Sequence, residues 1–119
     1  SIVRGNTSKK IVEMVRKQGA KNVYFASAAP PVRYQNVYGI DMPATKELVA
    51  HGKTVEEIRL FIGADELIYQ DIEDLRMAAH IGNTNITSFE DSVFTGKYRA
   101  GKISEEYLSQ LENNRSSKE

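Results

Sequence analysis

Two short β-prone runs alternate with helix-like segments along this chain, and that alternation constrains its fold more than any other feature. The runs are residues 23–26, VYFA, and residues 67–69, LIY. Strands that are separated by helices predict a parallel α/β sheet. A parallel sheet needs cover on both faces and partners at its edges, which two short strands do not supply. The sequence therefore predicts an α/β fold that is part of a larger domain.

Local start and stop signals mark two of the helices. Apolar residues recur at helical spacing over residues 9–18, and Gly19 is suited to end that helix. Thr54 and Glu57 have the spacing of a capping box. The helix that they begin is expected to end at Gly63.

Three further helices are expected: over residues 44–50, after Asp71 and after Ser104. Pro43 is suited to the first turn of the first of them, and Asp71 to the cap of the second. The expected apolar faces are Ile72, Leu75 and Ala78 in the second helix and Tyr107, Leu108 and Leu111 in the third. Prolines and a glycine predict an irregular segment over residues 27–43, and the stretch TSFEDSVFTGKY is expected to be loop or edge structure.

Charge and composition narrow the function classes. The 119 residues include 16 basic and 16 acidic side chains, so there is no overall positive field to recruit nucleic acid or a membrane surface. Cysteine is absent, which removes disulfides, thiolate metal sites and a cysteine nucleophile from this chain. No apolar run approaches the roughly 18 residues of a membrane span. We expect neither nucleic acid nor a membrane as a partner, and a cytoplasmic location.

The candidate binding site lies at residues 4–8, RGNTS, directly before the first helix. A helix N-terminus leaves backbone N–H groups without partners and carries about half a positive charge, both of which suit a phosphate. Gly5 permits close approach of the backbone, while Thr7 and Ser8 offer hydroxyl groups. The alternative is an ordinary helix start, in which Thr7 or Ser8 is the cap and Arg4 lies in solvent.

A resemblance favours the phosphate site. SIVRGNTS resembles the phosphoribosyl-pyrophosphate (PRPP) loop of type I phosphoribosyltransferases. Together with NVYFASAAPPVRYQNVYGIDMP, GADELIYQDIEDL and FEDSVFTGKY, it resembles the carboxyl-terminal part of the amidophosphoribosyltransferases. The resemblance implies part of a type I phosphoribosyltransferase domain, a Rossmann-like parallel sheet with carboxyl-terminal helices. We expect residues 1–111 to form this part of the domain and residues 112–119 to be a frayed polar tail.

The resemblance also implies roles for particular residues. Arg4, Gly5, Asn6, Thr7 and Ser8 match the loop that grips the 5-phosphate, with Asn6 where threonine is usual. The hydrophobic strand and acidic pair that hold the ribose hydroxyls in the family would fall before Ser1. No catalytic residue and no metal ligand is therefore expected in this chain.

A regulatory site and the cofactors are implied in the same way. Pro43 lies where the family places part of a regulatory purine-nucleotide site. Mg²⁺ is expected in the complete enzyme, with ligands upstream of Ser1. Some members hold an iron–sulfur cluster on cysteines, and none is expected here because the chain has no cysteine.

The implied function is that of an enzyme that makes 5-phosphoribosylamine from PRPP and glutamine, the first committed step of purine biosynthesis. The expected partners are PRPP, purine nucleotides as feedback inhibitors, a missing glutaminase domain and further copies of the complete enzyme. The isolated chain is expected to be inactive and poorly stable. Two alternatives stay open: a non-catalytic module that binds phosphate or purine nucleotides, and a different phosphoribosyltransferase.

Other candidates have simpler interpretations. Tyr34 and Tyr38 could stack on a base, but such tyrosines usually pack a loop against the sheet. His51 and His80 lack metal-ligand spacing and are expected at helix ends or on the surface. The run Thr95-Gly96-Lys97 lacks the other residues of a P-loop. Asp71, Glu73 and Asp74 are interpreted as cap and first-turn charges.

Overall fold

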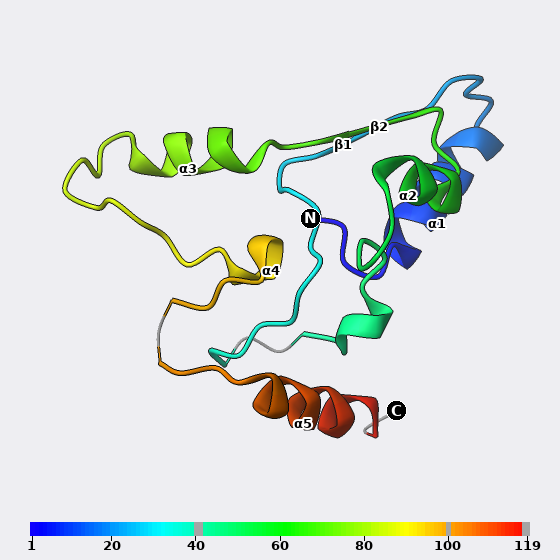
Figure 1. Ribbon diagram of the computed structural model, residues 1–119. Helices are drawn as coiled ribbons and strands as arrows, with labels where there is room; N and C mark the ends of the chain where they lie inside the picture. The colour runs from blue at the N-terminus through cyan, green and yellow to red at the C-terminus, as the bar shows by residue number, and fades with distance from the viewer. Residues whose placement is uncertain (40–41, 100, 118–119) are drawn as a thin grey trace.

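Helices alternate with two strands in the computed structural model, which describes residues 1–39, 42–99 and 101–117 (Figure 1). The elements are α1 (Asn6–Lys17), β1 (Tyr24–Ser27), the 3₁₀ turn η1 (Thr45–Glu47), α2 (Val55–Ile62), β2 (Glu66–Tyr69), α3 (Ile72–His80), α4 (Ser92–Thr95) and α5 (Glu105–Ser116). The strand pair runs between α1 and α2 at one end of the molecule and α3 at the other (Figure 1).

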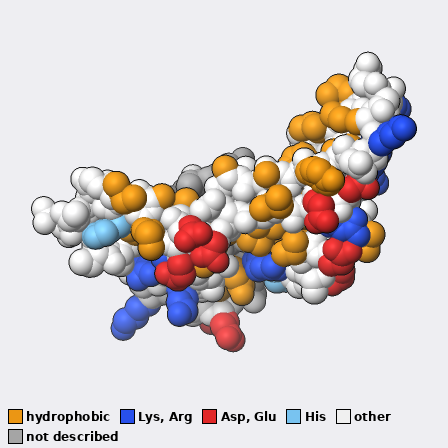
Figure 2. All heavy atoms as spheres, turned by 90° about the horizontal axis from the view of Figure 1, so that it is seen from above, with side chains coloured by type: hydrophobic (Ala, Val, Ile, Leu, Met, Phe, Trp, Pro, Cys, Tyr) orange, Lys and Arg blue, Asp and Glu red, His pale blue; other side chains and the backbone are white. Residues whose placement is uncertain are grey.

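Within the described residues the two strands form a parallel sheet, in register from Tyr24 opposite Glu66 to Ser27 opposite Tyr69. The parallel α/β arrangement is thus confirmed. Because side chains alternate across a strand, the sheet has a packed face and an open face. On the open face Tyr24 is 69% exposed and Ile68 is 60% exposed. Figure 2 shows hydrophobic side chains uncovered over the strand pair and α3.

The core lies between α1, α2 and the packed face of the sheet. It consists of Ile2, Val12, Val23, Val49, Ala50, Ile58, Ile62, Ala64 and Leu67, with Ala20, Phe25 and Tyr69 packed against it. Val12, Ile58 and Ile62 are at most 1% exposed. Because Ile2 and Val49 belong to this core, the segment before α1 and the segment after η1 are both anchored on it.

An ionic contact ties α1 to the strand pair. The Arg16 guanidinium donates to the Gly63 carbonyl at 2.7 Å and to the Asp65 carboxylate at 2.8 Å. The same Asp65 oxygen accepts the Val23 N–H at 2.7 Å. These hydrogen bonds, that of Val23 above all, hold the pKa of Asp65 below its ordinary value.

Most of the predicted helix boundaries are confirmed. Thr54 and Glu57 form a reciprocal capping box at the start of α2, and Gly63 ends that helix in the left-handed region with a φ of 79°. Asp71 accepts hydrogen bonds from two backbone N–H groups at the start of α3. Ser104 caps α5 by accepting the Tyr107 N–H.

Three expectations were wrong in detail. Residues 44–50 are not a helix: after the single turn η1 the chain becomes extended at Leu48, and the Val49 N–H then donates to the Val3 carbonyl at 2.9 Å. The Val49 N–H thus bonds to a distant segment instead of to a carbonyl of the preceding turn, and the helix does not continue. The stretch expected to be loop or edge contains the short helix α4.

The third concerns the carboxyl terminus, where helix α5 continues to Ser116, so residues 112–116 are not frayed. Glu112 accepts backbone N–H groups of η1, and Arg115 donates to the Asn36 carbonyl at 2.8 Å. These contacts hold the last turns in place. The remainder of the expected tail, residues 118–119, lies outside the described residues.

The molecule is flat and open. Its extents are 50 × 42 × 21 Å and its radius of gyration is 16.3 Å, whereas a compact chain of this length has a radius of about 13.5 Å. No helix in the described part of the chain is long and apolar enough to cross a membrane.

Candidate phosphate-binding site

A tight turn leads into α1 and forms the candidate site. Gly5 occupies the cap position of the helix with a φ of 81° and a ψ of −6°, in the left-handed region that favours glycine. Residues 1–8 line a hollow of about 390 Å³ in front of this turn. The helix begins at Asn6, so neither Thr7 nor Ser8 is its cap, and the ordinary-helix-start alternative is wrong on that point.

The position of Gly5 is fixed by packing as well as by conformation. A Cβ atom at this position would lie 3.0 Å from a ring carbon of Phe61 and 3.3 Å from a methyl group of Val49. Both neighbours come from other parts of the chain, one from α2 and one from the segment after η1. The backbone of the turn therefore lies close to these two side chains, and a Cβ atom at Gly5 would require them to shift.

The N-terminus of α1 is open to a ligand. Among the described residues no side chain caps this helix, so its first N–H groups keep the partial positive charge of the helix end. Arg4, Asn6 and Thr7 are exposed at the turn, whereas Gly5 and Ser8 are buried. The five predicted residues are thus brought together, but the side chain of Ser8 is less accessible than its position in the loop suggested.

Positive charge gathers beside the turn from two elements. The ammonium groups of Lys9 and Lys53 lie 5.3 and 5.5 Å from the centroid of the Phe61 ring, within the range of cation–π contacts. The same ring lies against Gly5, so it links the two lysines to the turn. The cation of the turn itself is Arg4, whose charge is partly offset by Glu47.

The segment after the long loop is hydrogen-bonded to the residues that line the hollow. Arg4 donates through Nε to a carboxylate oxygen of Glu47 at 3.1 Å. Val3 is joined to Val49 by the backbone hydrogen bond described above. Pro43 is half-buried and lies just before this segment, so it is linked to the loop through η1 but does not line the hollow.

Sequence reasoning missed Glu47, Lys53 and Phe61. Each is at least 39 residues from the loop, and no motif of the sequence links it to the RGNTS turn. Only the fold brings these three residues near the loop.

The two candidate tyrosines pack the long loop, as expected, but against the α4 region rather than against the sheet. The Tyr34 ring lies where a side chain at Gly96 would be, at 3.0 Å from an added Cβ atom. Tyr38 and Tyr98 form an edge-to-face pair with centroids 6.3 Å apart. Gly96 ends α4, so the Thr95-Gly96-Lys97 run serves as a helix end.

The histidines lie at turns and helix ends. His51 bonds through Nδ1 with the Arg33 carbonyl at 3.0 Å, and His80, the last residue of α3, with the Ile86 carbonyl at 2.7 Å. Among the described residues no group of three or more histidine, cysteine or acidic side chains comes together as a metal site.

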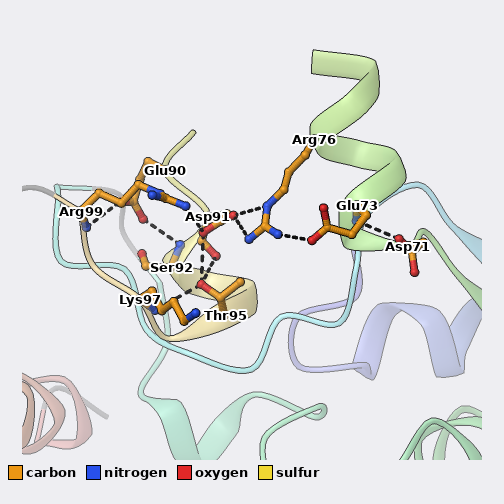
Figure 3. Close-up of polar contacts among 9 residues, drawn as sticks. All are labelled: Asp71, Glu73, Arg76, Glu90, Asp91, Ser92, Thr95, Lys97 and Arg99. Carbon is orange, nitrogen blue, oxygen red and sulfur yellow. Dashed lines mark hydrogen bonds and ion pairs between the residues drawn. The ribbon is translucent and has the colours of Figure 1, made fainter. Parts of the chain in front are cut away.

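A second polar cluster joins α3 to α4 (Figure 3). Arg76 donates to Asp91 from Nε at 2.8 Å and from a terminal nitrogen at 2.5 Å, and it also pairs with Glu73. Thr95 donates to the other Asp91 oxygen at 3.1 Å. Burial opposes the charge of Asp91, but the bonds from Arg76 and Thr95 outweigh it and hold the pKa of Asp91 below its ordinary value. Every carboxylate of the cluster is engaged within the protein, which indicates a structural role.

Comparison with known proteins places these features in context. No protein-family profile matches the chain. Amidophosphoribosyltransferase from Haemophilus influenzae is 55% identical over 115 residues, which are 97% of this chain and 23% of the relative. The Saccharomyces cerevisiae amidophosphoribosyltransferase is 50% identical over 117 residues, 98% of this chain and 22% of the relative. The chain thus spans less than a quarter of the length of these relatives.

Two solved structures are similar in fold. The glutamine PRPP amidotransferase from B. subtilis, complexed with ADP and GMP, matches 88% of this chain and 23% of its own with a TM-score of 0.71 and 38% identity. A structure described as the allosteric regulatory enzyme of purine biosynthesis matches 94% of this chain and 24% of its own, with a TM-score of 0.73 and 34% identity.

Proposed function

Because the chain belongs to the amidophosphoribosyltransferase family, of whose members it spans less than a quarter, we propose that it forms the part of such an enzyme that holds the 5-phosphate of PRPP. The complete protein makes 5-phosphoribosylamine from PRPP and glutamine in purine biosynthesis. The observation that carries this proposal is the uncapped N-terminus of α1 behind the left-handed Gly5, with the exposed side chain of Arg4 in the same turn.

Positioning is the contribution of this segment to the reaction. The N–H groups of the turn donate to the phosphate oxygens, and Arg4 supplies a charge-assisted contact. Asn6 contributes through its backbone, so the family's usual threonine is not needed there. A fixed 5-phosphate places C1 of the ribose relative to the incoming nitrogen, and orientation of this kind lowers the barrier by several kcal/mol.

The remaining chemistry belongs to other parts of the complete protein. Glutamine hydrolysis by a cysteine nucleophile needs a further domain, since this chain has no cysteine. Mg²⁺ offsets the charge of the leaving pyrophosphate. As the resemblance implies, its ligands belong to the part of the complete enzyme that precedes this segment.

Regulation and assembly complete the proposal. Purine nucleotides inhibit the complete enzyme at a site that includes Pro43. The B. subtilis relative was solved in complex with ADP and GMP, which supports nucleotide binding by the complete enzyme. The complete enzyme is a homo-oligomer in the cytoplasm, and it needs neither nucleic acid nor a membrane. Residues 1–111 belong to its phosphoribosyltransferase domain.

The test is an assay for pyrophosphate release from PRPP. We expect release by the full-length protein that carries this segment when glutamine is present, and none by the 119-residue chain alone. Release with a free purine or pyrimidine base in place of glutamine would instead identify a different phosphoribosyltransferase. Micromolar binding of GMP by the chain, with no turnover by the full-length protein, would identify a non-catalytic module.

A further inference from the structure

The side chain of Arg4 is held by a carboxylate that is itself fixed at both oxygens. One oxygen of Glu47 accepts Arg4 Nε at 3.1 Å, and the other accepts the Ala44 N–H at 3.0 Å. The Glu47 side chain is 19% exposed and that of Arg4 is 49% exposed. The pair is therefore anchored on the protein side and open on the solvent side, where a ligand of the loop would lie.

The turn η1, which carries Glu47, is itself held by a residue of α5. The Glu112 carboxylate accepts the Thr45 N–H at 2.7 Å and the Lys46 N–H at 3.1 Å. Burial raises the pKa of Glu112, but these two hydrogen bonds lower it further than burial raises it, so the group is charged at neutral pH. A carboxylate in this position satisfies the first N–H groups of a short helix, which otherwise lack partners.

The backbone of the phosphate loop is joined to the same segment. The Val49 N–H donates to the Val3 carbonyl, one residue before Arg4. Ala44, Leu48 and Val49 are all at most 5% exposed, so this segment has little freedom to move. Residues 44–49 therefore fix both the main chain and the side chain of the loop at Arg4.

We propose that Glu47 is a positioning residue for the phosphate site: by binding Nε it sets the orientation in which the Arg4 guanidinium meets the 5-phosphate. This inference rests on the proposed function of the loop. An arginine side chain has several rotatable bonds, and a ligand that must order it loses affinity. Orienting it before the ligand arrives avoids that loss.

A helix-capping role alone does not account for the geometry. Glu57 makes the same kind of contact in α2, where its carboxylate accepts the Thr54 N–H at 3.2 Å, but it binds no residue of the loop. Glu47 caps a single turn and also reaches a residue 43 positions away in sequence. Glu57 is thus a matched control for the loss of a capping carboxylate.

The experiment is a double-mutant cycle in the full-length protein that carries this segment, with ribose 5-phosphate as the ligand and calorimetry as the readout. We expect Glu47→Ala to weaken binding about three- to tenfold, which lies in the lower part of the range of coupling between contacting residues. Glu47→Gln keeps one acceptor oxygen, so its affinity for ribose 5-phosphate should lie between those of the natural protein and the Glu47→Ala variant. In an Arg4→Ala background Glu47→Ala causes no further loss, and Glu57→Ala leaves the affinity unchanged.

Three outcomes separate this inference from the proposed function. If Arg4→Ala weakens binding and Glu47→Ala weakens it by the same factor whether Arg4 is present or not, Glu47 acts on the fold alone and the inference is overturned. If Arg4→Ala itself leaves binding unchanged, Arg4 does not meet the phosphate and the inference is overturned. If ribose 5-phosphate binds no better than ribose, the loop is not the phosphate site and the proposed function fails. Should Glu47→Ala not fold, the cycle with Glu47→Gln is judged by the same criterion.

Discussion

At the residue scale, one glycine decides whether the loop can form. Gly5 combines a left-handed conformation with close contacts to Phe61 and Val49 that an added Cβ atom would crowd. Gly19, at the other end of α1, also has a positive φ, of 100°, but a Cβ atom there would meet nothing within 4 Å. A comparison of the two positions therefore separates the energetic cost of a left-handed alanine from the cost of its contacts with Phe61 and Val49.

We expect Gly5→Ala to lower the free energy of unfolding by about 2–5 kcal/mol, since left-handed strain costs about 1–2 kcal/mol and overpacking about 1–3 kcal/mol. Gly19→Ala is expected to cost about 1–2 kcal/mol, the strain alone. Denaturant unfolding of the full-length variants measures both. Equal losses for the two substitutions would show that Phe61 and Val49 do not confine the loop.

At the element scale, α3 is attached to α4 mainly through one buried carboxylate. Asp91 and Glu73 both bind Arg76, but the Asp91 side chain is 5% exposed and that of Glu73 is 71% exposed. Ion pairs in solvent contribute little, whereas a buried acceptor with several donors contributes more.

Asp91→Ala is expected to destabilise the α3–α4 contact by about 1–3 kcal/mol, because Arg76 and Thr95 lose their shared acceptor. Glu73→Ala is the matched control, with an expected effect within about 0.5 kcal/mol. Amide hydrogen exchange in α3 and α4 of the full-length protein reports the difference. Faster exchange in the Glu73 variant than in the Asp91 variant would contradict this assignment.

The same contact should depend on pH. Because folding lowers the pKa of Asp91 below its ordinary value of 3.8, its stabilisation is complete above that pH and is lost as the pH falls through the lower folded value. We expect exchange in α3 and α4 to accelerate below about pH 3.8 in the natural protein. An Asp91→Asn variant should lack this step, and a step of the same size in that variant would assign it to another group.

The elements that sequence predicts are those whose signals are local. The Thr54–Glu57 box, the Asp71 and Ser104 caps and the two strands are each specified by neighbouring residues, and each is confirmed. A helix was expected over residues 44–50, with Pro43 in its first turn. Only the turn η1 forms, because a backbone bond from Val49 to Val3 diverts the chain.

In the candidate site, too, the features that are local in sequence could be predicted and the long-range contacts could not. The turn at residues 4–8 is recognisable because a glycine, small polar residues and a helix start lie together in sequence. The contact of Arg4 with Glu47 spans 43 residues, and that of Arg115 with Gln35 spans 80. Contacts of this separation follow from the fold, so the partners of the loop could not be predicted from the sequence.

At the scale of the whole molecule, the chain does not close around its core. The sheet has two strands within the described residues, one of its faces exposes Tyr24 and Ile68, and the molecule is 21 Å thick along its shortest axis. A parallel sheet is normally covered on both faces. The open face is therefore a surface that the rest of a complete domain would bury.

We expect the isolated 119-residue chain to unfold over a broad range of temperature and to bind a hydrophobic dye at room temperature, since its exposed apolar surface is large for a single folded unit. Circular dichroism and dye fluorescence measure the two properties, with the full-length protein as the control. A sharp, cooperative melt of the isolated chain would count against this expectation.

The central claim, that the turn at residues 4–8 holds a phosphate, is tested most directly by titrating the full-length protein and its Arg4→Ala variant with ribose 5-phosphate. We predict that the substitution weakens binding at least about tenfold, because a charge-assisted hydrogen bond contributes about 1.5–3 kcal/mol. Lys17→Ala, which removes the same charge at the far end of α1, should change little, and ribose without phosphate should bind equally weakly to all three proteins. Equal affinities of the natural and Arg4→Ala proteins for ribose 5-phosphate would contradict the account.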